Sequence, residues 1–126
     1  MSDLPPFELG YARTELRRQL VAAVLAGEKT ATAGLWSEYE AEGEALGSAG
    51  DRFILHDYDD EPVAVVEVTE VRLVPAGEID VEFARDEGEG FESVDDWRVA
   101  HEEFFQQAIT PETKIVALRF RIVARL

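Results

Sequence analysis

The sequence contains no cysteine, and only two of its 12 basic residues are lysines. The absence of cysteine excludes disulfide bonds, thiolate catalysis and cysteine-based zinc sites. The two lysines are Lys29 and Lys114, and arginine carries the positive charge everywhere else. A desolvated amine can lose its proton, whereas a guanidinium cannot. A lysine in such a chain is therefore a candidate for a catalytic role that needs an amine.

Long apolar runs are also missing. No stretch of about 18 apolar residues occurs, so we expect no membrane partner and no transmembrane helix. The first ten residues, MSDLPPFELG, lack a basic segment followed by an apolar run. We therefore expect no secretory signal and a cytoplasmic location. No repeat or long linker interrupts the chain, so residues 1–126 are predicted to form a single domain.

The chain has little positive charge overall, with a net charge of −15. This balance argues against duplex DNA as a partner, because such binding needs many contacts between basic residues and phosphates. A local basic patch or a small ligand derived from nucleic acid stays open, and surface acid that serves solubility explains the charge equally well. The chain has no phosphate-binding loop of the Walker type and no metal-ligand spacing. We therefore expect neither a cofactor nor a metal, and we interpret Asp57, Asp59 and Asp60 as a solvated turn.

Residues 12–26 are predicted to form a helix. Leu16, Leu20 and Val24 recur at a spacing of four residues, which is typical of one buried helical face. Thr14 is a candidate for the N-terminal cap and Gly27 for the C-terminal stop. This assignment places Arg13, Arg17 and Arg18 on the outer face.

The middle of the chain predicts a helical turn at 36–41, strands at 52–57 and 63–74, and a short helix at 77–86. In the second strand Val66 and Val68 alternate with polar residues, and a bulge would keep Val71 and Leu73 on the same buried face. A second clear helix is expected at 93–108, capped by Ser93 with Asp96 at capping-box spacing. Its expected buried face carries Val94, Trp97, His101 and Phe104.

The last segment, 114–126, predicts a strand with Leu118, Phe120, Ile122 and Ala124 on one face. Arg119, Arg121 and Arg125 lie on the other face. They are either a phosphate-binding stripe or, more in keeping with so acidic a chain, partners of nearby carboxylates. The predicted elements do not alternate as strand, helix and strand, as a βαβ fold would require. It favours an α+β fold built on a small mixed or antiparallel β-barrel with flanking helices.

Two segments carry candidate chemistry. In GEKTATAGL, residues 27–35, the Lys29 amine could serve as base for the Thr32 hydroxyl; the alternative is a solvated lysine and a capping threonine. In EGEG, residues 87–90, the glycines could let Glu87 and Glu89 point into a cleft as acid–base groups; the alternative is a flexible acidic loop.

Trp36, Tyr39 and Trp97 could stack a planar ligand or belong to the core. His101 is either a buried structural histidine or a site residue.

Taken together, GEKTATAGL, the following WSEYEAEGEAL, the later ARDEGEG and the W-R-x-x-H element at 97–101 resemble the ASCH domain family. The resemblance covers residues 7–126 and is closest to single-domain bacterial members. It implies a PUA-like small mixed β-barrel with flanking helices, and a cleft bordered by the G-x-K-x-x-T motif. It also implies binding of RNA or a modified nucleoside.

In some members a lysine, a threonine and a glutamate remove the acyl group of N4-acetylcytidine. This carries over to Lys29, Thr32 and Glu87 as catalytic residues, with Glu89 as second choice for the glutamate. Trp36, Tyr39, Glu89, Trp97, Arg98 and His101 are then the expected substrate-binding residues, without metal or cofactor. The implied alternatives are an RNA-binding module without chemistry and a ribonuclease that acts on single-stranded RNA.

Overall fold

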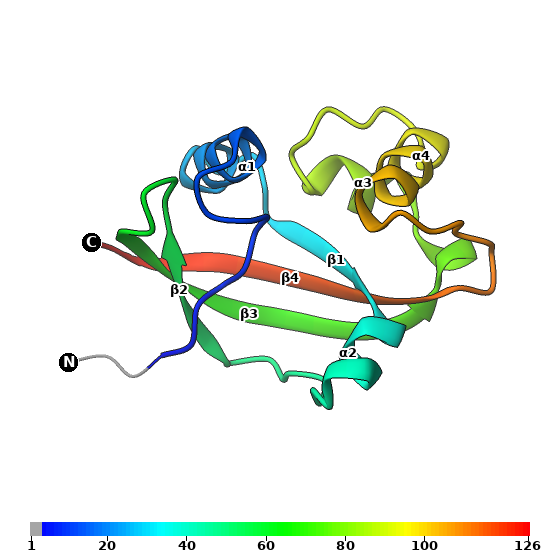
Figure 1. The fold of residues 1–126 in the computed structure, drawn as a ribbon, viewed down its shortest axis with the longest axis horizontal. Coiled ribbons are helices and arrows are strands. Elements are labelled where there is room, and N and C mark those ends of the chain that lie inside the picture. The colour runs from blue at the N-terminus through cyan, green and yellow to red at the C-terminus, as the bar shows by residue number, and fades with distance from the viewer. Residues whose placement is uncertain (1–3) are drawn as a thin grey trace.

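Four antiparallel strands form one curled sheet in the computed structural model, which describes residues 4–126 (Figure 1). The strand order is β1-β4-β3-β2. The C-terminal strand therefore lies inside the sheet, and the first two strands form its edges. The strand bounds are Ala31–Leu35 for β1, Arg52–His56 for β2, Pro62–Pro75 for β3 and Lys114–Arg125 for β4.

Helices cover one side of this sheet. In Figure 1, α1 lies over one end of the sheet, and α3 and α4 lie together over the other. A further short helix, α2, follows β1 directly at the opposite side. The bounds are Glu15–Leu25 for α1, Trp36–Glu42 for α2, Ala76–Glu78 for the 3-10 turn η1, Val81–Asp86 for α3 and Val94–Phe105 for α4. Across residues 4–126, no helix has the length and apolarity needed to cross a membrane.

Irregularities in β3 curl the sheet into a half-barrel. The register of β3 shifts between Val65 and Val66 and again between Val68 and Glu70, and such bulges bend a strand and increase its twist. The segment before α1 continues the wall beside β2, because the Phe7 amide donates to the Ile54 carbonyl at 2.8 Å. The result is an α+β, PUA-like half-barrel, which confirms the expected fold class.

The predicted N-terminal caps of both long helices and the Gly27 stop of α1 are confirmed, but α1 begins at Glu15 rather than at residue 12, and α4 ends at Phe105 rather than at residue 108. The Thr14 side chain accepts a hydrogen bond from the Arg17 amide at the start of α1, and Gly27 follows the end of α1 with φ +81°. At α4, the Ser93 hydroxyl accepts from the Asp96 amide. The Asp96 carboxylate accepts from the Glu92 amide, one residue before the position that a capping box would use.

Several expectations about elements are wrong. β1 was not expected as a strand, and residues 77–86 divide into η1 and α3 because Asp80 caps a new helix by accepting from the Phe83 amide. Arg17 is 5% exposed and points inward from α1. Leu73 and Phe104, both assigned to buried faces, are 39% and 50% exposed, while their neighbours Val74 and Phe105 pack against the core.

The hydrophobic core is divided into two clusters. One joins β1, α3 and α4 around Trp97 and Phe83. The other joins the N-terminal segment, α1, β2 and β3 around Phe7 and Val66. Because α1 and α4 do not merge into one core, a hollow can persist between the two clusters.

Candidate active site

A cavity of about 270 Å³ lies where the two core clusters meet. Its walls come from the segment before α1, from α1 and β1, from the loop after α3, and from α4. Apolar side chains such as Leu16, Leu20 and Phe105 form much of the wall. Seven polar side chains line the cavity. Five were expected from the sequence, namely Lys29, Thr32, Glu87, Glu89 and His101, and two were not, namely Glu8 and Glu103.

Lys29 is the only lysine in this cavity and is only 2% exposed. Its Nζ donates to the Glu87 carbonyl oxygen at 3.2 Å and to Glu89 Oε2 at 3.3 Å, and lies 3.6 Å from Glu87 Oε1. A buried ammonium needs such partners, because an unpaired charge in the interior is strongly disfavoured. The lysine is therefore held as one member of a charged cluster.

Glu87 lies at the centre of that cluster and is 1% exposed. One carboxylate oxygen, Oε2, accepts a short hydrogen bond from the Trp97 indole nitrogen. The other, Oε1, faces Lys29 Nζ and lies 3.4 Å from His101 Nε2. The side chain is thus fixed by donors from α4 and from the segment before β1.

His101 stands beside this carboxylate on α4, one turn after Trp97. Its ring stacks on the Trp97 ring with centroids 4.4 Å apart, and its Nδ1 lies 2.7 Å from the Trp97 carbonyl oxygen. Burial by itself would lower the pKa of His101, but the hydrogen bond and charge of Glu87, the Trp97 carbonyl and the charge of Glu89 outweigh it. The net effect raises the pKa of His101 above its usual 6.5.

Glycine is required where the glutamate loop meets the lysine. Gly88 has φ +70°, and a Cβ there would lie 2.5 Å from the Glu28 carbonyl oxygen and 2.7 Å from Lys29 Cα. The Thr30 amide also donates to the Asp86 carbonyl oxygen at 2.7 Å. These backbone contacts bring Glu87 and Lys29 together although 57 residues separate them in the chain.

Four expected substrate-binding residues lie outside the cavity lining. Trp36 and Tyr39 stack on each other in α2 with ring centroids 6.0 Å apart, and the Tyr39 ring covers Gly34 of β1. Trp97 is 1% exposed and lies behind Glu87. Arg98 donates to Glu102 at 2.9 Å on the outer side of α4. In this structure, Trp36 and Tyr39 pack locally, Trp97 supports Glu87, and Arg98 belongs to a surface ion pair.

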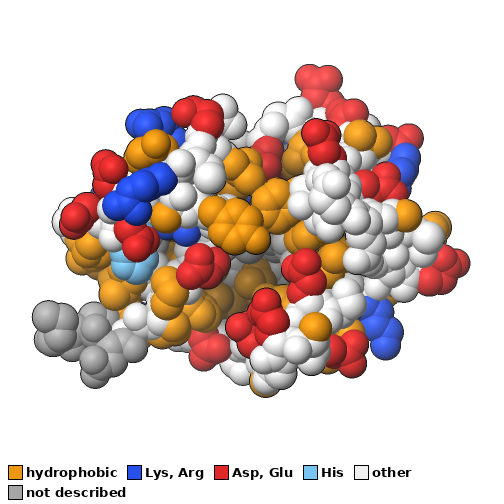
Figure 2. All heavy atoms as spheres, in the orientation of Figure 1, with side chains coloured by type: hydrophobic (Ala, Val, Ile, Leu, Met, Phe, Trp, Pro, Cys, Tyr) orange, Lys and Arg blue, Asp and Glu red, His pale blue; other side chains and the backbone are white. Residues whose placement is uncertain are grey.

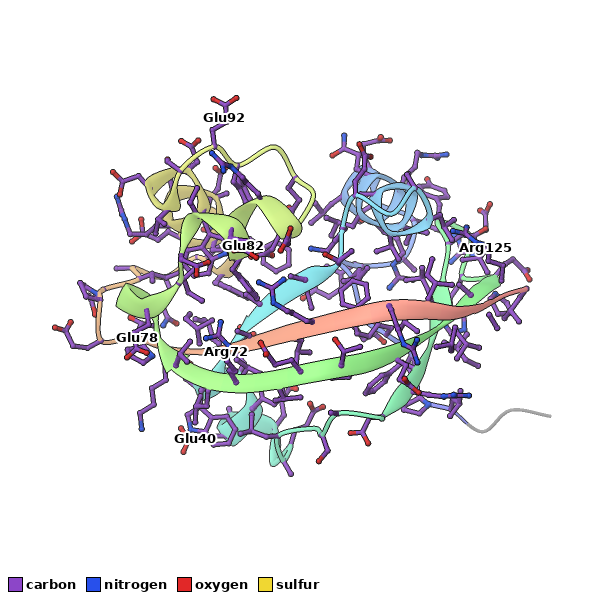
Figure 3. All side chains as sticks on the ribbon, turned by 180° about the vertical axis from the view of Figure 1, so that it is seen from behind. Glu40, Arg72, Glu78, Glu82, Glu92 and Arg125 are labelled. Carbon is purple, nitrogen blue, oxygen red and sulfur yellow. The ribbon has the colours of Figure 1, made fainter. Side chains whose placement is uncertain are left out.

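The arginines of β4 are engaged by carboxylates and a carbonyl. Arg119 donates to Asp86 at 2.7 Å, and Arg121 donates to Glu67 at 2.9 Å. Arg125, labelled in Figure 3, reaches the Leu25 carbonyl at the end of α1 at 2.9 Å. The pairing interpretation of these arginines therefore fits the structure better than a phosphate-binding stripe.

The mouth of the cavity is acidic and apolar. Glu8, Glu89 and Glu103 all contribute to the lining, together with Phe91 and the half-exposed Phe104. Figure 2 shows this face, where hydrophobic side chains gather between α1 and α4 with acidic side chains around them. Sequence reasoning missed Glu8, Phe91, Phe104 and Phe105 as lining residues. The sequence offered a signal only for Phe91, which directly follows the EGEG segment.

The N-terminal wall was also missed, and it depends on the buried Arg17. This side chain donates to the Leu9 and Gly10 carbonyl oxygens at 3.3 and 3.0 Å and pairs with Glu8 and Asp60, both at 3.4 Å. It holds residues 8–10 against α1. The available signal for its inward direction was its place in the predicted helix, beside Leu16 and one turn before Leu20.

Other surface features lack such a polar cluster. A shallow depression between Leu73, Pro75 and Pro111 is lined mainly by apolar side chains and has only Glu112 and Lys114 as charged residues. Within residues 4–126, no group of three or more histidine, aspartate or glutamate side chains is arranged to hold a metal ion. The Asp57 carboxylate accepts from the Asp59 and Glu61 amides, as expected for a turn.

Comparison with known proteins gives a family and a fold. A family model described as the ASCH domain matches residues 9–124. A crystal structure of a protein from Enterococcus faecalis V583 is 28% identical, with a TM-score of 0.86 over 99% of this chain and 79% of that chain. The ASCH domain from Lactobacillus crispatus JV V101 is 27% identical, with a TM-score of 0.73 over 83% of this chain and 70% of the other. None of the curated proteins matches this chain.

Proposed function

The chain belongs to the ASCH domain family, and from this premise we propose that it is an amidohydrolase acting on N4-acylated cytidine or a related small amide. The family and the PUA-like fold support a ligand related to RNA. The observation that carries the narrower proposal is the cavity itself. It brings a buried lysine, a threonine and two glutamates to one place, as amide hydrolysis requires.

Lys29 is best suited to stabilise the oxyanion that forms on the acyl oxygen. The structure pairs its Nζ with carboxylates of Glu87 and Glu89, so it is arranged as a fixed positive charge rather than as a free amine. A preorganised donor of this kind is worth about 100- to 1,000-fold in rate. This arrangement favours water as the nucleophile over Thr32, whose hydroxyl would then orient the substrate or the water.

The two glutamates differ in exposure, which suggests different tasks. The Glu89 side chain is 27% exposed and the Glu87 side chain is 1% exposed. Glu89 can reach a water in the cavity and accept its proton. Glu87, fixed by Trp97 and His101, is placed to deliver a proton to the leaving exocyclic amine.

The size and charge of the cavity favour a nucleoside over an oligonucleotide. Its volume of about 270 Å³ is just below the roughly 300–1,000 Å³ of most small-molecule sites. Its mouth carries Glu8, Glu89 and Glu103, which would repel phosphate groups. The ribonuclease and RNA-module alternatives both need a cationic surface, whereas Arg119 and Arg121 of β4 are paired with Asp86 and Glu67.

The test is an absorbance assay of the purified protein with N4-acetylcytidine. Lys29→Met keeps the side-chain length but removes the charge, and we expect turnover to fall at least about 100-fold. Lys114→Met is the matched control, since Lys114 is the other lysine and lies outside the cavity at the start of β4. Circular dichroism checks that both variants are folded.

Each outcome of this assay has a clear meaning. Conversion to cytidine by the wild type and Lys114→Met, but not by Lys29→Met, would support the proposal. Equal activity in folded Lys29→Met would contradict the role of the lysine. Absence of turnover in the wild type would refute the hydrolase and leave a binding domain.

A further inference from the structure

The hydrogen bonds around His101 restrict where its protons can be. Nδ1 lies 2.7 Å from the Trp97 carbonyl oxygen, which can only accept, so Nδ1 carries a proton. In a neutral ring Nε2 would then be a bare acceptor. Yet Nε2 lies 3.4 Å from Glu87 Oε1, which as a carboxylate is also an acceptor. Two facing acceptors repel, so the pair requires one additional proton between them.

Charge balance supports the presence of that additional proton. The charged groups around His101 are Glu87 after α3 and Glu89 in the following loop, and Lys29 faces the same Oε1 atom of Glu87. Glu103 of α4 and Glu8 of the N-terminal segment line the same cavity. Without the proton, Lys29 alone would face both Glu87 and Glu89, and an uncompensated negative charge in a buried cluster is costly. The donors to Glu87 place the proton on the ring, because the Trp97 indole and the Lys29 amine both stabilise the ionised carboxylate.

The neighbouring aromatic rings fix the histidine in this position. Its ring lies 4.4 Å from Trp97, 5.7 Å from Phe91 and 5.9 Å from Phe105, measured between ring centroids. The Trp97 indole also holds Oε2 of the same glutamate. Glu87 Oε1 is therefore left to face His101 and Lys29.

We propose that His101 is a positioning residue that holds a proton on Nε2 in the resting protein and passes it through Glu87 to the leaving amine. The delivery step rests on the proposed amide hydrolysis. Water attacks the acyl carbon and gives one proton to Glu89. As the carbon–nitrogen bond breaks, His101 gives its Nε2 proton to the Glu87 carboxylate, and Glu87 gives that proton to the leaving nitrogen, so Glu87 ends the step ionised and His101 neutral. The products are the carboxylic acid and the free amine, and solvent restores the proton on His101 while removing the one on Glu89.

The resting proton is tested by ¹⁵N NMR of the histidine rings in the wild-type protein across a pH series. His56 of β2 lies outside the cavity lining and gives a second ring signal for assignment. We expect His101 to stay doubly protonated at pH values above 6.5, the usual pKa of a histidine. In Glu87→Gln, whose amide can donate to Nε2, the ring should become the neutral Nδ1–H tautomer. A wild-type His101 that becomes neutral at or below pH 6.5 would overturn the proposal.

Delivery of the proton is tested by the pH dependence of kcat with N4-acetylcytidine. The wild-type rate should fall as pH rises through the NMR titration of His101, and His101→Gln should lose that dependence. His56→Gln should keep the wild-type profile. An unchanged profile in folded His101→Gln would contradict delivery even if the NMR result holds. A wild type without turnover would remove the delivery step together with the proposed function, whereas NMR would still decide the resting proton.

Discussion

Two residues beside Lys29 and Glu87 support the cavity, Gly88 through its missing side chain and Trp97 through its indole N–H group. Gly88 has no Cβ because the backbone of Glu28 and Lys29 occupies that space. Trp97 contributes one N–H group to Glu87 and is otherwise a buried ring. Both residues hold the cavity together from outside its lining. Substituting them therefore tests structural support of the cavity separately from contact with a ligand.

Gly88→Ala should lower the free energy of unfolding by about 2–5 kcal/mol, because the new methyl group meets backbone atoms as well as an unfavourable positive φ. The matched control is Gly90→Ala. Gly90 also has a positive φ, +85°, but nothing lies within 4 Å of a Cβ there. That variant should lose only about 1–2 kcal/mol. Urea denaturation measures both, and equal losses would show that the close approach does not matter.

Trp97→Phe should impair turnover more than Trp36→Phe. The first change removes the donor to Glu87 Oε2 and leaves a buried carboxylate with one partner fewer, at a cost of about 1–3 kcal/mol. The second affects a ring that stacks on Tyr39 away from the cavity. Steady-state kinetics with N4-acetylcytidine tests this order. A raised KM in Trp36→Phe alone would instead point to α2 as a substrate-binding element.

At the scale of elements, the site depends on the C-terminal ends of α1 and α3 and on one face of α4. The α1 end and Gly27 bring the chain to Lys29, α3 ends at Glu87, and α4 presents Trp97 and His101 one turn apart. These ends come from segments far apart in the chain. The sheet beneath them is held by β3–β4 pairing and by side-chain contacts between strands, such as Glu67 with Arg52 and Arg121.

Much of this arrangement was predictable from local patterns, and the rest was not. The Leu16–Leu20–Val24 spacing, Thr14 and Gly27 are local signals, and they predicted α1 closely. β1 has the sequence ATAGL, whose small residues show no alternation, and only pairing with β4 makes it a strand. The inward direction of Arg17 depends on carbonyl groups of residues 9 and 10, which no helical pattern reveals. The contact between Lys29 and Glu87 could not be predicted from local patterns either, because it joins two segments that are far apart in the sequence.

Arg17→Met should loosen the N-terminal wall of the cavity. The substitution keeps an apolar stem but removes the donors to the Leu9 and Gly10 carbonyls, which costs about 1–3 kcal/mol for each group left unpaired. Amide hydrogen exchange of residues 7–10 should become faster. Arg18→Met is the control, since the Arg18 side chain is 57% exposed, pairs with Glu15 and lies over the Tyr58 ring, and makes no hydrogen bond or ion pair with the described residues 8–10. Unchanged exchange in Arg17→Met would mean that the wall is held by its apolar contacts alone.

Glu67 should make the sheet sensitive to acid. Hydrogen bonds from Arg121 and Arg52 lower the pKa of Glu67 below 4.5, so its contribution to stability is present above that value and is lost as pH falls. Glu67→Gln should therefore be less stable than the wild type at pH 7, and the difference should shrink in acid. Thermal denaturation across pH measures this, with the exposed Glu40 of α2 changed to Gln as control (Figure 3). A difference that is constant with pH would contradict the pairing.

The whole molecule is a strongly acidic domain, with a net charge of −15 and an acidic cavity mouth. Apart from the buried Arg17, its arginines are spread over the surface, and many are paired with carboxylates. The negative charge of the domain therefore repels polyanions at long range. The apolar walls of the cavity can still pack against a planar group such as a nucleoside base. Discrimination between nucleosides and phosphorylated ligands is expected from this distribution.

N4-acetylcytidine should be a better substrate than its 5′-monophosphate, and the difference should narrow at high salt because screening weakens repulsion. Glu103→Gln, at the cavity mouth, should also narrow it, whereas Glu40→Gln, on α2, should not. The ratio of kcat/KM values measures the preference. Binding of single-stranded RNA that weakens when Arg119 and Arg121 are neutralised would contradict this view and favour an RNA-binding surface on β4.

The position of β4 inside the sheet has a consequence for the order in which the protein can fold. β1 has β4 as its only neighbour in the sheet of residues 4–126, and residues 36–113 lie between the two strands in the sequence. Such long-range pairing is slow to form, typically on the scale of milliseconds to seconds. While the chain is being synthesised, the strand that carries Thr32 has no partner in the sheet until residues 114–125 have been made. The wall of the cavity that β1 provides therefore forms late, after the segments that supply Glu87 and His101.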